Sequence, residues 1–285
     1  MTRFDAILDS STAQGIANAL HGCAKLRYRP PEELVINFVK HLTNKMQCKS
    51  MHVSSCLLSC LHLVCMPPSN VLHVLLQHMC ASGDAGSQGS ANTVFAVSGL
   101  LFLAQDSPTL QQCLHLLRNL ASMCKPEVVE DATQLLQAHQ ACAAVGVEQL
   151  LPAALLEHCQ QRLQKDPRKP VQSSLQKQVV GVLKGLDVLE HVRTEQPVLM
   201  GTSHTDVLCI TGSGAQVLVE VDGPSHFFAN QAGMLDGSSR LKHALLRHQG
   251  HMLVSLDYRD WIACKGSAAQ RALLMRLLGE AVPGL

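Results

Sequence analysis

Aromatic residues and net charge are both scarce in this chain of 285 residues. One Trp, two Tyr and six Phe make 3% aromatics, and 23 Lys and Arg against 22 Asp and Glu leave a formal net charge of +1. A near-neutral chain has no global basic field, so a nucleic-acid contact would need a local basic stripe. Apolar residues make up 47% of the chain, so it can bury the core of one large domain or of two ordinary ones.

Paired cysteine spacings are also missing. None of the twelve cysteines forms a Cys-x-x-Cys pair, and Cys56, Cys60 and Cys65 fall within a Leu-rich helical pattern. Free cysteine behaves as a small buried hydrophobe, so we expect no disulfides and a reducing compartment. A zinc site around Cys60, His62 and Cys65 is the alternative that the sequence leaves open.

No apolar run reaches the length that crosses a membrane. The nearest, residues 53–66, is interrupted by Ser and His and ends at Pro67-Pro68. The first nine residues contain two acids and lack the Arg- and Ser-rich character of a transit peptide. We therefore expect no membrane partner, and either no targeting segment or an N-terminus that is supplied by a longer protein.

Residues 1–165 are predicted to form a helical repeat region. Helical spacing of apolar and small residues over 12–26 breaks at Tyr28-Arg-Pro-Pro31, and a second helix is expected over 32–45. The same order recurs in units that open near Ser50 and Ala91 and break at Pro67-Pro68 and Asp106-Ser-Pro108. Helix, proline-containing turn and helix at a fixed period predict an α-solenoid. The alternative is an irregular helical bundle.

The repeat pattern weakens in two places. A fourth unit, residues 126–144, is short enough to serve as an end cap, and the glycine-rich segment 83–89 is expected to be a flexible insertion between units.

Residues 166–285 are predicted to form a small α/β domain. Asp166-Pro-Arg-Lys-Pro170 interrupts the helical pattern, and Ser173-Ser-Leu-Gln176 resembles a capping box that opens a helix to about Leu186. The remaining expected elements are strands over 207–210, 216–221 and 252–256 and helices over 240–248 and 268–281.

The strand before Gly223-Pro224 carries two acids, Glu220 and Asp222, which share a face because they are two residues apart. If the hairpin is symmetric about Ser213, Asp206 lies opposite Glu220, roughly 5 Å away between Cβ atoms. A slip of one residue would turn Asp206 to the other face. Three carboxylates this close need a hard cation such as Mg²⁺, or one must stay protonated.

The segment Glu220-Val-Asp-Gly-Pro-Ser-His-Phe227 resembles the RAP domain, as do Gly237-Ser-Ser-Arg-Leu-Lys242 and Tyr258-x-x-Trp261. The resemblance covers about residues 171–280. RAP domains occur in organellar RNA-processing proteins of algae, plants and apicomplexans and in the animal FAST-kinase-like family. Their fold is similar to that of the PD-(D/E)xK endonuclease superfamily. The upstream helices resemble octotricopeptide repeats, best in the first unit at residues 17–34.

The resemblance implies a set of site residues. Asp206 and Glu220 correspond to the two acids of the nuclease superfamily and would be the Mg²⁺ ligands of a nuclease. Asp222 stands where that superfamily has lysine, so Lys242 on the following helix is the candidate replacement. The candidate RNA-binding residues are His226, Phe227, Arg240, Lys242 and Trp261. His226 held structurally after the Gly-Pro turn and Trp261 in the core are the alternatives.

The leading hypothesis is an RNA-binding protein of organellar RNA processing (including ribosomal RNA processing), stability or translation, in a mitochondrion or chloroplast. Its expected partners are single-stranded or structured organellar RNA and other RNA-processing proteins, with no cofactor. The enzyme alternative is a Mg²⁺-dependent RNA endonuclease that uses the acidic cluster, against which the missing lysine counts. A third hypothesis is a helical protein-binding scaffold without nucleic acid, which near-neutral charge and few aromatics favour.

Overall fold

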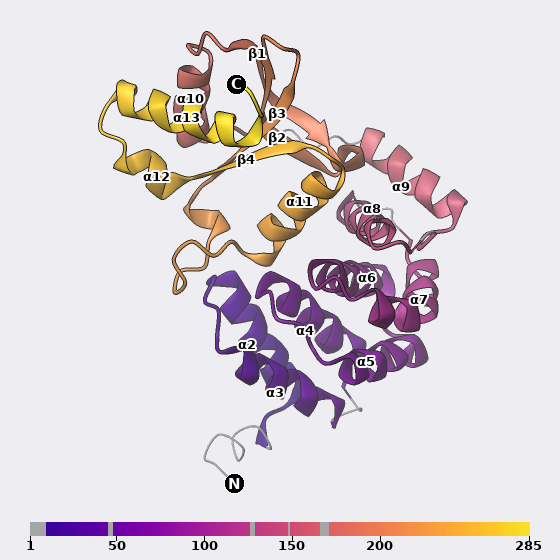
Figure 1. Cartoon of the computed structure of the whole chain (residues 1–285). Coiled ribbons are helices and arrows are strands. Elements are labelled where there is room, and N and C mark those ends of the chain that lie inside the picture. The colour runs from indigo at the N-terminus through magenta and orange to yellow at the C-terminus, as the bar shows by residue number, and fades with distance from the viewer. Residues whose placement is uncertain (1–9, 45–47, 126–128, 148, 166–170) are drawn as a thin grey trace. The chain divides into compact units, whose positions relative to one another are not determined.

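Helices make up most of the chain, and a four-stranded sheet lies in its C-terminal part (Figure 1). The computed structural model describes residues 10–44, 48–125, 129–147, 149–165 and 171–285. Two units can be distinguished. The helical unit comprises 1–167, 228–232 and 236–241, and the sheet unit comprises 168–227, 233–235 and 242–285. Within the described ranges, no helix combines the length and the apolar character that crossing a membrane requires.

The first part of the helical unit is a series of helix pairs. Helices α2, α4, α6 and α8 contact one another in succession, as do α3, α5 and α7, and α9 packs against α8. The bounds are α2 Ala13–Lys25, α3 Glu32–Thr43, α4 Ser50–His62, α5 Ser69–Ser82, α6 Gly86–Leu103, α7 Ser107–Ser122, α8 Val129–Ala144 and α9 Ala153–Lys165. The prediction of a helical N-terminal region is confirmed.

Prolines and caps set the starts of the helices. Pro31 and Pro68 are the residues before α3 and α5, as expected for a residue that fixes φ and lacks an N–H. Asp106 caps α7 by accepting a hydrogen bond from the N–H of Thr109, and Thr12 caps α2 by accepting from the N–H of Gly15. These local signals explain why the breaks between helices could be placed from the sequence.

Two expectations about the helical region were wrong. The segment 83–89 is not an insertion, because Gly83 ends α5 in the left-handed conformation and α6 already begins at Gly86. The fourth unit is not a lone cap, because α9 pairs with α8. The first turn of α6, residues 86–89, is polar and glycine-rich, which hid the start of this helix in the apolar pattern.

Hydroxyl groups connect neighbouring helix pairs. Ser54 donates to the carbonyl of Gly89 at 3.0 Å, and Ser107 donates to the carbonyl of Val145 at 3.2 Å. Ser87 donates to the carboxylate of the buried Asp131 at 2.8 Å. These bonds give the buried polar groups between the helices their hydrogen-bond partners. The buried carboxylate of Asp131 is among the groups that have one.

Two later segments of the sequence belong to the helical unit. The side chain of Asn230 exchanges two hydrogen bonds, both of 2.8 Å, with the backbone of Arg29. Gly237, the first residue of α11 (Gly237–His248), lies so close to Leu61 that an added Cβ would stand 1.7 Å from the Leu61 carbonyl oxygen. Only glycine fits at this position.

The sheet unit is built on strands β1 (Leu189–Val198), β2 (Ser203–Thr211), β3 (Gln216–Asp222) and β4 (Met252–Asp257), in that order across the sheet. The first three are antiparallel, and β4 is parallel to β3. The helices are α10 (Ser174–Leu183), whose capping box at Ser173 is present, the C-terminal part of α11, α12 (Tyr258–Ala263) and α13 (Ser267–Ala281). Strand β1 and helix α12 were not expected.

The two faces of β3 differ in character. Val217, Val219 and Val221 lie in an apolar core with side chains of α10 and α13. Because side chains alternate along a strand, Glu220 and Asp222 point to the other face, as predicted. There they contact Lys242 and His243 of α11.

Candidate functional site

The hairpin of β2 and β3 has the expected register. Val207 pairs with Val219, which places Asp206 opposite Glu220. The carboxylate of Asp206 accepts hydrogen bonds from the N–H of Val221 at 2.7 Å and from the side chain of Gln176 at 2.6 Å. Asp206 therefore lies against β3 beside the other two acids, and α10 helps to hold it there through Gln176.

Glu220 is a buried carboxylate with a single cationic partner. Its side chain is 2% exposed, and its Oε2 lies 2.5 Å from the Nζ of Lys242, which also donates to the carbonyl of His204 at 2.8 Å. The Oε1 atom is buried without a hydrogen bond of standard geometry among the described residues. Burial raises the pKa of Glu220 to about 7, although Lys242 and the Thr205 hydroxyl oppose the shift. Glu220 can therefore exchange a proton near neutral pH.

Asp222 is held by a hydroxyl and two imidazoles rather than by a Lys or Arg side chain. Its carboxylate is 1% exposed and accepts a hydrogen bond from Ser255 at 2.6 Å. Imidazole nitrogens of His226 and His243 lie 3.5 and 3.6 Å from Oδ1. Burial raises the pKa of Asp222 and lowers that of His243 to about 3, so His243 is neutral at pH 7. Asp222 and the neutral His243 are therefore in polar contact without forming an ion pair.

Glu195 is a fourth acid near this cluster, and the sequence analysis did not single it out. It stands on β1 between Thr194 and Gln196, whose partners on β2 are Val207 and Thr205, so it lies opposite Asp206. Its φ of 53° is left-handed, which is uncommon for a residue with a side chain. Burial raises its pKa, and the charge of Asp206 adds to the shift. The alternation that reveals a strand is weak in β1, which hid this residue.

The structure brings Asp206, Glu220, Asp222 and Lys242 together, but they do not form a ready metal site. Among the described residues, no group of three or more His, Cys, Asp or Glu side chains is arranged to hold a metal ion. Both oxygens of Asp206 accept hydrogen bonds, and the Lys242 ammonium already neutralises Glu220. Mg²⁺ requires near-octahedral oxygen ligands, so this arrangement does not fit it.

The alternative zinc site around Cys60, His62 and Cys65 does not form a ligand group either. Burial raises the pKa of Cys60 and raises that of Cys65 to about 12, whereas zinc needs thiolates. All twelve cysteines are free, and eight are buried, in agreement with their interpretation as small apolar residues.

Two aromatic candidates for RNA binding are buried. Trp261 is 2% exposed, lies in the core of the sheet unit and has its indole N–H 3.4 Å from Gln178. Phe227 is 7% exposed and packs against Tyr258, with 5.8 Å between ring centroids. Neither ring has a free face on which a base could stack, so the structure favours the core alternative for Trp261. His226 and Arg240 are half-buried and retain accessible surface.

Arg259 is a cation that the sequence analysis missed. Its Nε lies 2.9 and 3.1 Å from the two carboxylate oxygens of Asp257, and its Nη2 donates to the same group. The guanidinium also stacks over the Phe227 ring, 4.6 Å from the centroid. Asp257 ends β4 beside Asp222 at the end of β3. Arg259 is thus a pre-oriented guanidinium, 31% exposed, at the carboxyl ends of two parallel strands.

Comparison with protein-family models gives a match over residues 219–277, to the family described as the RAP domain. The chain contains a RAP domain. The match runs from β3 to α13, so it includes Glu220, Asp222, His226, Lys242 and Arg259. A comparison with curated proteins returned no match. RAP domains are generally associated with RNA binding.

Proposed function

We propose that this protein binds RNA and acts in the processing, stability or translation of organellar transcripts. The observation that carries the proposal is a RAP domain in the same chain as stacked helix pairs. Stacked pairs of helices create extended surfaces in repeat proteins. We interpret the pairs α2 to α9 as an octotricopeptide-like solenoid that follows single-stranded RNA, and the sheet unit as an endonuclease-like α/β fold.

The cations near the strand ends support RNA contact by the RAP domain. Arg259 is held in one orientation by Asp257 and Phe227, and a fixed guanidinium suits phosphate recognition. His226 follows the end of β3 by four residues, and its side chain is 41% exposed. We assign phosphate contact to Arg259 and His226, with Lys242 and Arg240 as further candidates and without base stacking on Phe227 or Trp261.

Salt-titrated binding to organellar transcripts tests the proposal. The affinity for mitochondrial and for chloroplast transcripts is measured for this protein and for a neutral control protein of similar size. Neutralised phosphates release counterions, so affinity is expected to fall steeply as salt rises. Binding no stronger than that of the control at low salt would remove the RNA function and favour the protein-binding scaffold. A preference for one set of transcripts would assign the organelle, and crosslinking would identify the targets.

A second candidate function is RNA cleavage, which one observation favours. Lys242 reaches the acids from α11, where it can supply the positive charge that Asp222 cannot. The hydrogen bonds of Asp206 and the poor fit to Mg²⁺ argue the other way. Cleavage that needs divalent metal and is lost in both Asp206→Ala and Glu220→Ala would establish the activity. Cleavage that both variants retain would exclude this site.

A further inference from the structure

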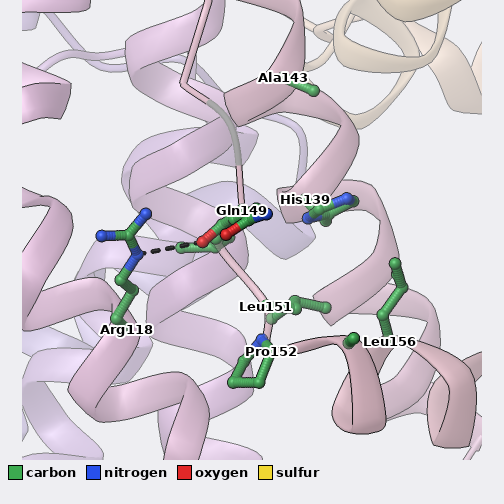
Figure 2. Close-up of a pocket in the computed structure, with 9 residues that line it drawn as sticks. Arg118, His139, Ala143, Gln149, Leu151, Pro152 and Leu156 are labelled. Carbon is green, nitrogen blue, oxygen red and sulfur yellow. Dashed lines mark hydrogen bonds between the residues drawn. The ribbon is translucent and has the colours of Figure 1, made fainter.

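A cavity of about 700 Å³ lies in the helical unit, away from the acidic cluster in sequence (Figure 2). Its walls come from α7, α8, residues 149–152 and α9. The lining residues are Arg118, His139, Ala143, Gln149, Leu150, Leu151, Pro152, Ala153 and Leu156. Its volume is within the range of sites for small organic ligands, roughly 300–1,000 Å³.

The polar groups of this cavity are fixed in place. Arg118 donates from Nε to the carbonyl of Gln149 at 3.0 Å, the dashed bond in Figure 2. Gln149 has a left-handed φ of 57°, a strained conformation that is enriched at ligand sites. The arginine is thereby positioned by a backbone segment that has itself been bent away from its preferred geometry.

His139 adds a polar atom that lacks a partner. Its Nδ1 is buried, and no described residue forms a hydrogen bond with it. Burial lowers the pKa of His139, so the imidazole is neutral at pH 7, with one ring nitrogen a donor and the other an acceptor. A buried polar atom without a partner costs free energy. The rest of the half-buried His139 ring is the part that lines the cavity and that a ligand would meet.

The lining restricts the chemistry of the ligand. Ala143, Leu151, Pro152 and Leu156 form an apolar wall, which disfavours a small inorganic anion. Arg118 is the one charged residue of the lining, and it is cationic. A flat group with apolar faces and hydrogen-bonding edges, joined to a single negative charge, matches this set. Nucleotides have this composition.

We propose that the cavity binds one nucleotide of single-stranded RNA, with the base against the apolar wall and its phosphate on Arg118. His139 and the Gln149 amide would contact the edge of the base. The inference rests on the proposed RNA-binding function and adds a position at which the helical unit distinguishes a base.

A substitution that fills the cavity tests the proposal without removing a contact. Ala143 is exposed and is the second-last residue of α8, so Ala143→Phe adds bulk to the lining. Ala81 is also exposed and is the second-last residue of α5, and Ala81→Phe is the matched control. Affinity for labelled single-stranded oligonucleotides of A, C or U is measured for the full chain, together with binding of free AMP, CMP and UMP.

We expect Ala143→Phe to lose about tenfold in affinity for the preferred oligonucleotide, which corresponds to the loss of one base contact. Ala81→Phe should bind as the wild type does. Arg118→Gln should lower the slope of log affinity against log salt by about one phosphate contact. If these variants have the same unfolding temperature as the wild type, a loss of binding is due to the change in the cavity and not to a loss of folded protein.

The outcomes separate the two proposals. Wild-type binding to RNA that Ala143→Phe leaves unchanged would overturn the nucleotide cavity and leave the RNA function intact. An absence of RNA binding by the wild type would remove the RNA function itself. Free nucleotides bound by a wild type that ignores RNA would replace the proposal with a free-nucleotide site.

Discussion

The two units of this protein treat their buried polar groups differently. In the helical unit, most of these groups are hydroxyls such as Ser54, which donates to a carbonyl of the next helix pair. In the sheet unit, β3 buries two carboxylates, Glu220 and Asp222, whose pKa values burial raises. A hydroxyl is easily satisfied, whereas a buried carboxylate is costly. The acids of β3 are therefore the more costly buried groups, and a role for them in function stays a prediction.

The close packing of the helical unit should be the most sensitive feature. In Gly237→Ala, the new Cβ would overlap the Leu61 carbonyl oxygen, 1.7 Å away, so the backbone must move. We expect a loss of about 3 kcal/mol or more in the free energy of unfolding, measured by chemical denaturation. Gly181 in α10 has nothing within 4 Å of an added Cβ, so Gly181→Ala should stabilise by up to about 1 kcal/mol. Equal effects of the two substitutions would show that the packing at Leu61 is loose.

The ion pair of the sheet unit should rank next. Lys242→Met leaves Glu220 buried without its cation, which should cost about 2–3 kcal/mol at pH 8. The cost should be smaller at pH 6, because Glu220 can then take up a proton. Exposed Lys177 in the same unit provides the control, and Lys177→Met should leave the denaturation midpoint nearly unchanged. A Lys242→Met variant as stable as wild type at pH 8 would contradict the assigned pairing.

The pH dependence of stability should differ between wild type and Glu220→Gln. Between the ordinary pKa of 4.5 and the folded value of about 7, unfolded chains lose the proton that folded chains keep. Stability from this group is therefore lost as pH rises, by about 1 kcal/mol per pH unit. Glu220→Gln removes this loss, so its stability relative to wild type should increase from pH 5 to pH 7.5. The raised pKa of Asp222 acts in the same direction and remains in both proteins.

Parallel stability profiles for wild type and Glu220→Gln would show that Glu220 titrates as an exposed acid. Denaturation at several pH values at constant ionic strength gives the comparison directly, since groups other than residue 220 cancel in the difference.

The hydroxyl contacts of the helical unit should have the smallest effect. Ser54→Ala removes the bond to Gly89 and should cost about 1 kcal/mol. Ser55, the next residue of α4, is half-buried, and Ser55→Ala serves as control. A loss as large as that of Lys242→Met would break the distinction between the two units.

Much of the sheet unit was predictable because its signals are local. Strand β3 and the turn at 212–214 fix the register that places Asp206 opposite Glu220, and the capping box at Ser173 marks the start of α10. The reach of Lys242 to Glu220 was expected only as an alternative, since it depends on how α11 crosses the sheet. Glu195 and Ser255 could not be inferred, because their roles arise from contacts between strands. The stacking of Arg259 on Phe227 was hidden because it joins residues far apart in the sequence.

The helical region shows the same limit. Prolines and caps revealed the helix pairs α2–α3, α4–α5 and α6–α7. Pro152, immediately before α9, is the same kind of signal, which the sequence analysis did not use. The cavity beside α9 was also hidden, because it depends on the strained backbone at Gln149 and on side chains from three helices.

The central claim, that the RAP domain contacts RNA phosphate through its pre-oriented cation, is tested most directly by RNA affinity as a function of salt. Wild type is compared with Arg259→Gln and with Arg276→Gln, an exposed arginine paired with Glu280 on α13. The account predicts that Arg259→Gln weakens binding several-fold at about 50 mM salt and lowers the log–log slope by about one, while Arg276→Gln matches wild type. Identical curves for all three proteins would contradict it.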